Sequence, residues 1–415
     1  MREPAGPAGV REANARAWRI ERSAVAEDET LNAWFVSFAV ALAATLSATQ
    51  FVRVTALKLS AVDRPGGRRL HRRPTARLGG LGIFWGFAGA LLLMVYGDPG
   101  WKHLIAGAEL RMLGLLAGAG AVLILGLVDD VRGLGAGAKL TVQVAAAVTL
   151  WCCGWRIEAV DLPGVGRWSL ASLSLPLTVG WIVFVTNAFN LIDGLDGLAC
   201  GVALIGALAM CLILGPQYAF GRIASVALAG ALLGFLWFNF NPALIFMGDS
   251  GSLFVGFVLS AITLRIGHAQ HSAFPVVPAL LVALPILDTV GAIVRRSLRT
   301  IRASRSPVDF LRNVFSRMFT ADRSHMHHTL LLAGLSIRRA VAVLWVVSAS
   351  FALCAWLYLE HPVAGMALAV VLGAGWTVGF EQLRRRVRAP AALAMRARAS
   401  GPPPAPIPGE ADVAA

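Results

Sequence analysis

Five aspartates lie at the ends of apolar segments, where charged side chains are costly and usually functional. Asp129 and Asp130 end one such segment. Asp193 and Asp196 follow another, and Asp249 lies between two more. Neighbouring carboxylates repel one another unless a cation offsets their charge. Mg²⁺ suits oxygen ligands and is commonly bound through one or two carboxylates together with substrate phosphates.

A histidine cluster accompanies these carboxylates. His325, His327 and His328 form the run HMHH, and many arginines lie in the loops nearby. Phosphoryl transfer uses a metal that bridges phosphates, cations that stabilise the transition state, and a group that orients the nucleophile. We therefore interpret the set as a phosphoryl-transfer site. The alternative of a zinc site is weaker, because zinc favours thiols or three converging ligands and no cysteine is near the run in sequence.

The elements that position these residues are predicted to be membrane helices. The 415-residue chain is 57% hydrophobic and 14% charged, whereas soluble domains carry about 25% charged residues. The expected fold class is an all-α polytopic membrane protein with about eleven transmembrane helices and cytoplasmic catalytic loops, each helix long enough for a hydrocarbon core of about 30 Å. The predicted spans are 34–55, 79–97, 112–129, 138–154, 176–191, 198–215, 223–239, 250–267, 276–295, 339–358 and 362–381.

The positive charge of the chain, +14, is distributed asymmetrically between the loops. Arginine and lysine gather in segments 58–77, 295–339 and 384–398, which the positive-inside rule assigns to the cytoplasm. The N-terminus is then outside and the C-terminus inside, and the aspartates and histidines all face the cytoplasm. Because the basic residues are next to predicted spans, their expected partners are membrane lipids and not nucleic acid.

The chain is predicted to form one membrane domain between two tails. Residues 1–33 are polar and residues 383–415 are basic and then rich in proline, so both are expected to be disordered. The membrane-embedded domain is expected to cover residues 34–382. It includes a basic cytoplasmic loop, 296–338, that carries the HMHH run.

Five segments, in chain order, carry a more specific pattern. They are DRPGGRRLHRRPTARLGG (63–80), LGLVDDVRGLGAGAKLTVQ (125–143), NAFNLIDGLDGLA (187–199), FNFNPALIFMGDSGS (238–252) and SPVDF…ADRSHMHHTL (306–330). Together they resemble the polyprenyl-phosphate N-acetylhexosamine-1-phosphate transferases of glycosyltransferase family 4. The resemblance covers about residues 58–335, and Ala76 departs from it where the first motif usually has proline.

The resemblance implies a reaction in the bacterial cytoplasmic (inner) membrane. Undecaprenyl phosphate and a UDP-N-acetylhexosamine give undecaprenyl-diphospho-sugar and UMP, with Mg²⁺ as cofactor and Mn²⁺ as a possible substitute. The interrupted run HMHH is similar to the branch that uses UDP-GlcNAc to begin cell-surface polysaccharides such as O-antigen. The alternative branch, the phospho-N-acetylmuramoyl-pentapeptide transferases, has a contiguous histidine run. A homodimer is a possible assembly.

The resemblance also implies roles for individual residues. The expected metal ligands are Asp249 and Asn190. The expected catalytic residues are Asp129, Asp130, Asp193, His325, His327 and His328, and the expected substrate-binding residues are Lys139, Asn187, Asp196, Phe246, Arg69 and Arg72. Lys139 would meet a phosphate, Asp196 would lie near uracil, and Phe246 would stack on it.

Ordinary structural roles remain as alternatives. Aspartates are common in turns, Lys139 could be an interfacial anchor, and the arginines of 64–77 could hold anionic lipid headgroups. Asp288 is an acid within an apolar segment that has no assigned role. A lipid-linked-sugar flippase and a polyprenyl-diphosphate hydrolase are competing functions. Transporters, however, place their sites near the middle of the membrane, and the acids here gather at one face.

Overall fold

The protein is described here from a computed structural model. The described residues are 7–58, 62–63, 74–98, 101–162, 166–215, 218–269, 275–303 and 325–399. Arg69, Arg72 and most of the predicted cytoplasmic loop therefore lie outside the described residues.

The described chain is almost entirely helical, with two short pairs of strands. The helices are α1 (Pro7–Lys58), α2 (Gly79–Tyr96), α3 (Lys102–Ile105), α4 (Glu109–Arg132), α5 (Ala136–Cys152), α6 (Ser174–Ile192), α7 (Leu198–Ile213), α8 (Ala219–Asn239), α9 (Gly248–Ala269), α10 (Val276–Leu281), α11 (Ala283–Ala303), α13 (Met326–Leu332), α14 (Ile337–Glu360) and α15 (Pro362–Ala399). A short 3₁₀ helix, η2 (Ala171–Leu173), precedes α6. The strand pairs are antiparallel: β1 (Val62–Asp63) with β2 (Thr75–Ala76), and β3 (Ala159–Leu162) with β4 (Gly166–Ser169).

Helix length and hydropathy confirm an all-α polytopic membrane protein. Among the described residues, eight helices are long and apolar enough to cross a membrane. These segments are Leu31–Lys58, Gly79–Tyr96, Glu109–Arg132, Ala171–Ile192, Ala219–Asn239, Gly248–Ile266, Ile337–Glu360 and Pro362–Val387. Two further apolar helices, α5 and α7, are shorter. The sequence predicts eleven spans, so the remaining difference concerns the segment 276–295.

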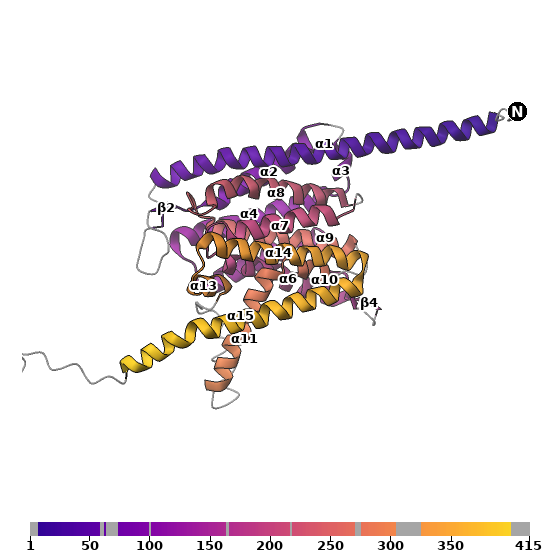
Figure 1. Cartoon of the computed structure of the whole chain (residues 1–415). Coiled ribbons are helices and arrows are strands. Elements are labelled where there is room, and N and C mark those ends of the chain that lie inside the picture. Colours follow the sequence, from indigo (N-terminus) through magenta and orange to yellow (C-terminus); the bar gives the residue numbers. More distant parts are fainter. Residues whose placement is uncertain are drawn as a thin grey trace, which may run out of the picture.

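The predicted span 276–295 is interrupted, with α10 ending at Leu281 and α11 beginning at Ala283. Pro285 explains the break, because proline has no N–H for the carbonyl four residues earlier and its ring crowds that carbonyl. That carbonyl belongs to Leu281, the last residue of α10. Figure 1 shows α11 running at a steep angle to the other helices.

The two ends of the described chain differ from the predicted tails. α1 begins at Pro7 and α15 continues to Ala399, so residues 7–33 and 383–399 are helical where the sequence predicts disorder. Both segments are rich in alanine and arginine, which have high helix propensity. An isolated helix without a packed face is only marginally stable in water, so the disorder expected for the two tails stays a prediction.

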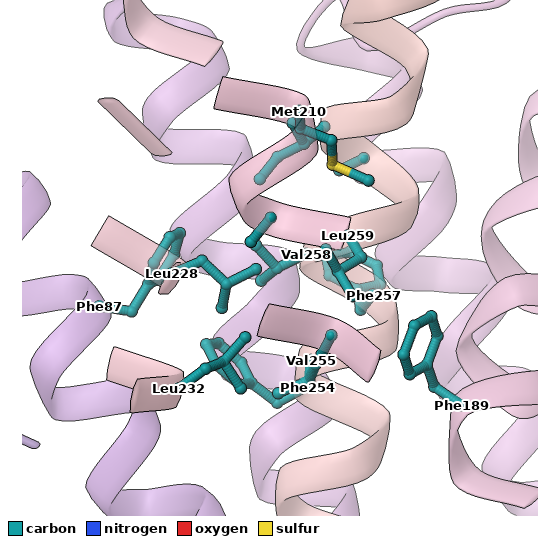
Figure 2. Close-up of a cluster of buried hydrophobic side chains, with 14 of the residues drawn as sticks. Phe87, Phe189, Met210, Leu228, Leu232, Phe254, Val255, Phe257, Val258 and Leu259 are labelled. Atoms are coloured by element: carbon teal, nitrogen blue, oxygen red, sulfur yellow. The ribbon is translucent and has the colours of Figure 1, made fainter. Parts of the chain in front are cut away.

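Helix α9 forms the centre of the bundle and packs against α2, α4, α6 and α7. Figure 2 shows its Phe254 and Phe257 between Phe87 of α2 and Phe189 of α6. All four rings are buried, and Phe87 meets Phe254 edge to face with the ring centroids 5.8 Å apart. Since lipid tails are as apolar as these side chains, close packing is the main force that joins the helices.

Glycine permits a closer approach where α4 meets the first turn of α9. A β-carbon at Gly126 would lie only 2.6 Å from the carbonyl carbon of Asp249 and would also overlap the backbone of Ser250. One helical turn after Gly126 comes Asp130, on the same face of α4. The contact therefore sets the distance between Asp130 and the start of α9.

We predict that Gly126→Ala destabilises the protein, whereas Gly120→Ala on the same helix does not. No described atom lies within 4 Å of a β-carbon at Gly120. Overpacking against a backbone costs about 1–3 kcal/mol, while an accommodated glycine-to-alanine change in a helix gains up to about 1 kcal/mol. Thermal unfolding of the detergent-purified variants measures the difference. Equal midpoints for the two variants would contradict the close contact.

Candidate active site

Lys139 lies between two carboxylates that come from different helices. Its ammonium group, in the first turn of α5, forms an ion pair with Asp129 at the end of α4 and another with Asp249 Oδ2 (2.6 Å) at the start of α9. The three side chains are only partly exposed, by 23%, 10% and 32%. Asp129 Oδ1 also accepts the backbone N–H of Leu134 (2.6 Å). The cation that the aspartates require is thus supplied, in this structure, by lysine.

Asp130 faces the N-terminus of α9. Its Oδ1 accepts the N–H of Asp249 (2.9 Å) and its Oδ2 accepts the N–H of Ser250 (3.1 Å). The first N–H groups of a helix have no partner within that helix. The Asp130 carboxylate, from α4, accepts hydrogen bonds from two of them. Gly248, with φ +71°, leaves the room: a β-carbon there would lie 2.5 Å from Asp130 Oδ2. Asp130 therefore holds the turn that carries Asp249, while its predicted catalytic role stays a prediction.

The two predicted asparagines of α6 have different partners. The Asn190 amide nitrogen donates to Asp249 Oδ1 (3.1 Å) and to Ser252 Oγ (3.0 Å), so Asn190 lies in the carboxylate site. Asn187, one turn earlier, donates to Gln143 Oε1 (2.5 Å) and to the Val183 carbonyl. Gln143 was missed as a site residue, although it lies four residues after Lys139 and hence on the same face of α5.

Asp196 fastens the loop between α8 and α9. Its Oδ2 accepts the Asn241 side-chain amide (2.8 Å) and the Ala243 N–H (3.0 Å). Asn239 acts in the same way from the other side, accepting the Gly197 N–H and donating to the Ile245 carbonyl, both at 3.0 Å. Hydrogen bonds thus join the motif NLIDGLDG to the motif FNFNP. The sequence did not reveal this role of Asn239 and Asn241. The expected contact of Asp196 with uracil stays a prediction.

Phe246 lies where this loop meets the arginine-rich segment. Its N–H donates to the Ala76 carbonyl (2.9 Å) and its carbonyl accepts the Gly79 N–H (3.1 Å). Its side chain is half-buried. Arg77 forms an ion pair with Asp63 (2.6 Å) across the β1–β2 pair. The described residues on either side of 64–73 are therefore paired with each other, Asp63 with Thr75, next to the Ala76 carbonyl that accepts the Phe246 N–H.

The three histidines lie in a row that reaches the turn after α6. The rings of His325 and His327 are parallel with centroids 5.9 Å apart, and those of His327 and His328 are 4.3 Å apart. A β-carbon on Gly194 would collide with the His327 ring. Burial, followed by the neighbouring His328, lowers the pKa of His327 to about 3, so this imidazole is neutral near pH 7. The histidine run thus meets the Asp193–Gly194 turn.

Asp193 has the most perturbed carboxyl group outside the membrane spans. Burial raises the pKa of Asp193 to about 8, and the negative charges of Asp249, Asp130 and Asp196 add to the increase. The residue as a whole is partly accessible to solvent, while its carboxyl group is buried. A carboxyl group in these surroundings keeps its proton near neutral pH unless a cation approaches it.

The donor atoms fit a hard cation that is bound together with phosphate. In the described part of the chain, no three His, Cys, Asp or Glu side chains form a metal-ligand group. Asp129 and Asp249 nevertheless already share one cation, Lys139, and Asn190 adds an amide. Two carboxylates and an amide suit Mg²⁺, which usually keeps water or substrate phosphates among its ligands.

Comparison with known proteins identifies the family. The model of glycosyl transferase family 4 matches residues 112–267. The probable undecaprenyl-phosphate N-acetylglucosaminyl 1-phosphate transferase of Bacillus subtilis is 36% identical over 333 residues, covering 79% of this chain and 86% of that protein. The chain belongs to glycosyl transferase family 4. The matched region of this family member runs from α4 to α9 and so includes Asp129, Lys139, Asn190 and Asp249.

Two further relatives have polyprenyl-phosphate acceptors in their names. The decaprenyl-phosphate N-acetylglucosaminephosphotransferase of Mycolicibacterium smegmatis is 36% identical over 368 residues, covering 82% of this chain and 86% of that protein. The undecaprenyl-phosphate alpha-N-acetylglucosaminyl 1-phosphate transferase of Escherichia coli K12 is 28% identical over 312 residues, covering 73% and 77%. The family predicted from the motifs is confirmed.

We predict that Asp193→Asn stabilises the metal-free protein at pH 8 and that the gain shrinks toward pH 4. The folded protein holds the Asp193 proton up to a pKa of about 8, whereas an unfolded aspartate releases it near pH 3.9. Wild-type stability therefore falls as pH rises between these values, and asparagine removes that dependence. Unfolding midpoints in EDTA across this range measure the effect. A gain that is constant with pH would contradict the raised pKa.

Proposed function

We propose that this family 4 transferase moves N-acetylglucosamine 1-phosphate from UDP-GlcNAc to undecaprenyl phosphate, with undecaprenyl-diphospho-GlcNAc and UMP as products. The observation that carries the proposal is the Lys139 bridge between Asp129 and Asp249, where the ends of α4, α5 and α9 meet. The names of the relatives at 36% and 28% identity support the acceptor and the sugar. The reaction would be the first membrane step of cell-surface polysaccharide synthesis.

In the proposed reaction, an oxygen of the lipid phosphate attacks the β-phosphorus of the UDP-sugar. The bond from that phosphorus to the α–β bridging oxygen breaks, and UMP leaves with the electron pair. A phosphate monoester has a second pKa of about 6, so near neutral pH the nucleophile is already largely ionised. The work of Asp129 and its neighbours is therefore to orient the nucleophile more than to remove a proton.

The charges of the site support this chemistry. Lys139 offsets charge on the two carboxylates and can turn toward a phosphate when another cation takes its place. Asp249 and Asn190, joined by a hydrogen bond of 3.1 Å, would hold Mg²⁺, with Mn²⁺ as a substitute. When bound, the metal would supply positive charge that offsets the negative charge developing on the leaving group. His327, neutral and against Gly194, would contact the diphosphate or the sugar.

The proposed location is the bacterial cytoplasmic membrane with the site toward the cytoplasm. The start of α14 lies at the same end of the bundle as the site, because Arg338 donates to the Asn241 carbonyl (2.9 Å). Arg384 and Arg385 follow near the end of the last membrane span. Basic residues next to the spans on this side agree with the positive-inside rule. The homodimer remains a prediction.

A direct assay tests the proposed reaction. Detergent-purified protein is incubated with Mg²⁺, undecaprenyl or decaprenyl phosphate, and one of a panel of UDP-sugars, and UMP and the lipid product are measured. We expect UMP and a lipid-diphospho-sugar with UDP-GlcNAc and undecaprenyl phosphate. Turnover with a different donor or only with decaprenyl phosphate would correct the substrate. No UMP from folded protein with any pair would overturn the proposal in favour of a flippase.

We predict that Asp249→Asn and Asp129→Asn each abolish detectable turnover while the protein still inserts and folds. Each change removes a negative charge from the Lys139 bridge, and losing a group that holds the catalytic charges costs at least about 100-fold in rate. Product formation is compared with that of Ser350→Ala, whose hydroxyl bonds only its own helix, to the Val346 carbonyl, on the exposed side of α14. Wild-type-like turnover in either aspartate variant would refute these roles.

A further inference from the structure

Asp288 uses both of its carboxylate oxygens on the residues that begin the histidine run. Its Oδ2 lies 2.8 Å from His325 Nδ1, and its Oδ1 accepts the Met326 N–H at 2.9 Å. The Asp288 side chain is 2% exposed and that of His325 is 8% exposed. A buried carboxylate is costly unless it is hydrogen-bonded. These two bonds, made across 37 and 38 positions of sequence, offset that cost.

The two hydrogen bonds of Asp288 hold the start of α13, the helix that contains His327 and His328. Met326 is the first residue of α13, and its N–H would otherwise be one of the helix's unpaired donors. The other side of Met326 is held by α15, where the Trp376 indole N–H donates to the Met326 sulfur (3.2 Å). The helix is thus attached to α11 through its backbone and to α15 through a side chain.

The Asp288 contact also fixes the proton of His325. A carboxylate accepts hydrogen bonds, so the contact places a proton on His325 Nδ1, the ring nitrogen that faces Asp288. The His325 ring is parallel to that of His327 (8° between planes). His327 in turn packs against Gly194, beside Asp193. The orientation of His325 is therefore linked to the turn after α6 through a single side chain, the ring of His327.

We propose that Asp288 is a positioning residue of the transferase. It holds His325 in one tautomer and one orientation, and thereby aligns the row His325–His327–His328 with the Asp193–Gly194 turn. The proposal rests on the proposed function, since that reaction gives the histidines their contact with the diphosphate. A proton- or ion-carrying role, the usual reason for an acid within an apolar helix, fits less well because both oxygens of Asp288 are already occupied by its own chain.

We predict that Asp288→Asn lowers kcat about 10–100-fold, the usual cost of losing a partner that orients a functional histidine, with little change in KM for the UDP-sugar. The amide oxygen can still accept the Met326 N–H, but asparagine cannot accept both bonds. Thr289→Val is the matched control, because Thr289 is the next residue, is buried, and has no hydrogen-bond partner for its hydroxyl among the described residues. A wild-type kcat in Asp288→Asn would overturn the proposal.

A double variant separates positioning from simple damage. If Asp288 acts through His325, then adding Asp288→Asn to the His325→Gln variant should not lower kcat further. The effects of substitutions at contacting residues are not additive when one residue acts through the other. Losses in kcat that multiply would mean that Asp288 acts independently of His325 and would overturn the proposal.

A measurement that needs no turnover distinguishes this proposal from the proposed function. In protein labelled with ¹⁵N-histidine, with the His325 signal assigned through His325→Gln, we expect Nδ1 of His325 to be protonated in wild type and in Thr289→Val. That signature should be lost in Asp288→Asn. An unprotonated Nδ1 in wild type would overturn the Asp288 proposal. A correct signature in protein that forms no lipid product would support the Asp288–His325 pair and reject the transferase assignment alone.

Discussion

The arrangement of this protein depends on bringing carboxylates from separate helices to one end of a membrane bundle without an uncompensated charge. Asp129 and Asp249 come from α4 and α9, and Lys139 of α5 lies between them. In an apolar environment the two carboxylates would repel one another, and the lysine makes their approach favourable. In the proposed function, a bound metal would take over the charge that Lys139 offsets in this structure.

The backbone contacts around the site also help to keep the carboxylates close together at this end of the bundle. Gly126 lets α4 touch the first turn of α9, and Asp130, one turn further along α4, then supplies the acceptor for two N–H groups of that turn. On the neighbouring side, Asp196 and Asn239 connect the turn after α6 to the loop before α9. Several motif residues thus act by accepting hydrogen bonds from the backbone.

The histidine run reaches the same place from a distant part of the sequence. Pro285 ends α10 and lets α11 take a different direction, which places Asp288 beside His325. Through the parallel rings of His325 and His327, α11 is connected to the Asp193–Gly194 turn. The break in the predicted span 276–295 and the buried Asp288 are both connected with the position of the histidines.

The sequence by itself determined the all-α membrane class, the family, and the gathering of Asp129, Lys139, Asn190, Asp249 and the histidines, because apolar length and motif spacing are local properties. It also placed these residues at one end of the helices, since each lies at a span boundary. Only the tertiary structure decided which partner each side chain has. Asp130 and Asp196 bind backbone N–H groups, Asn187 pairs with Gln143, and Asp288 holds His325. Such pairings depend on how closely helices approach and rotate, and the packing of glycines and bulky side chains from distant segments sets both.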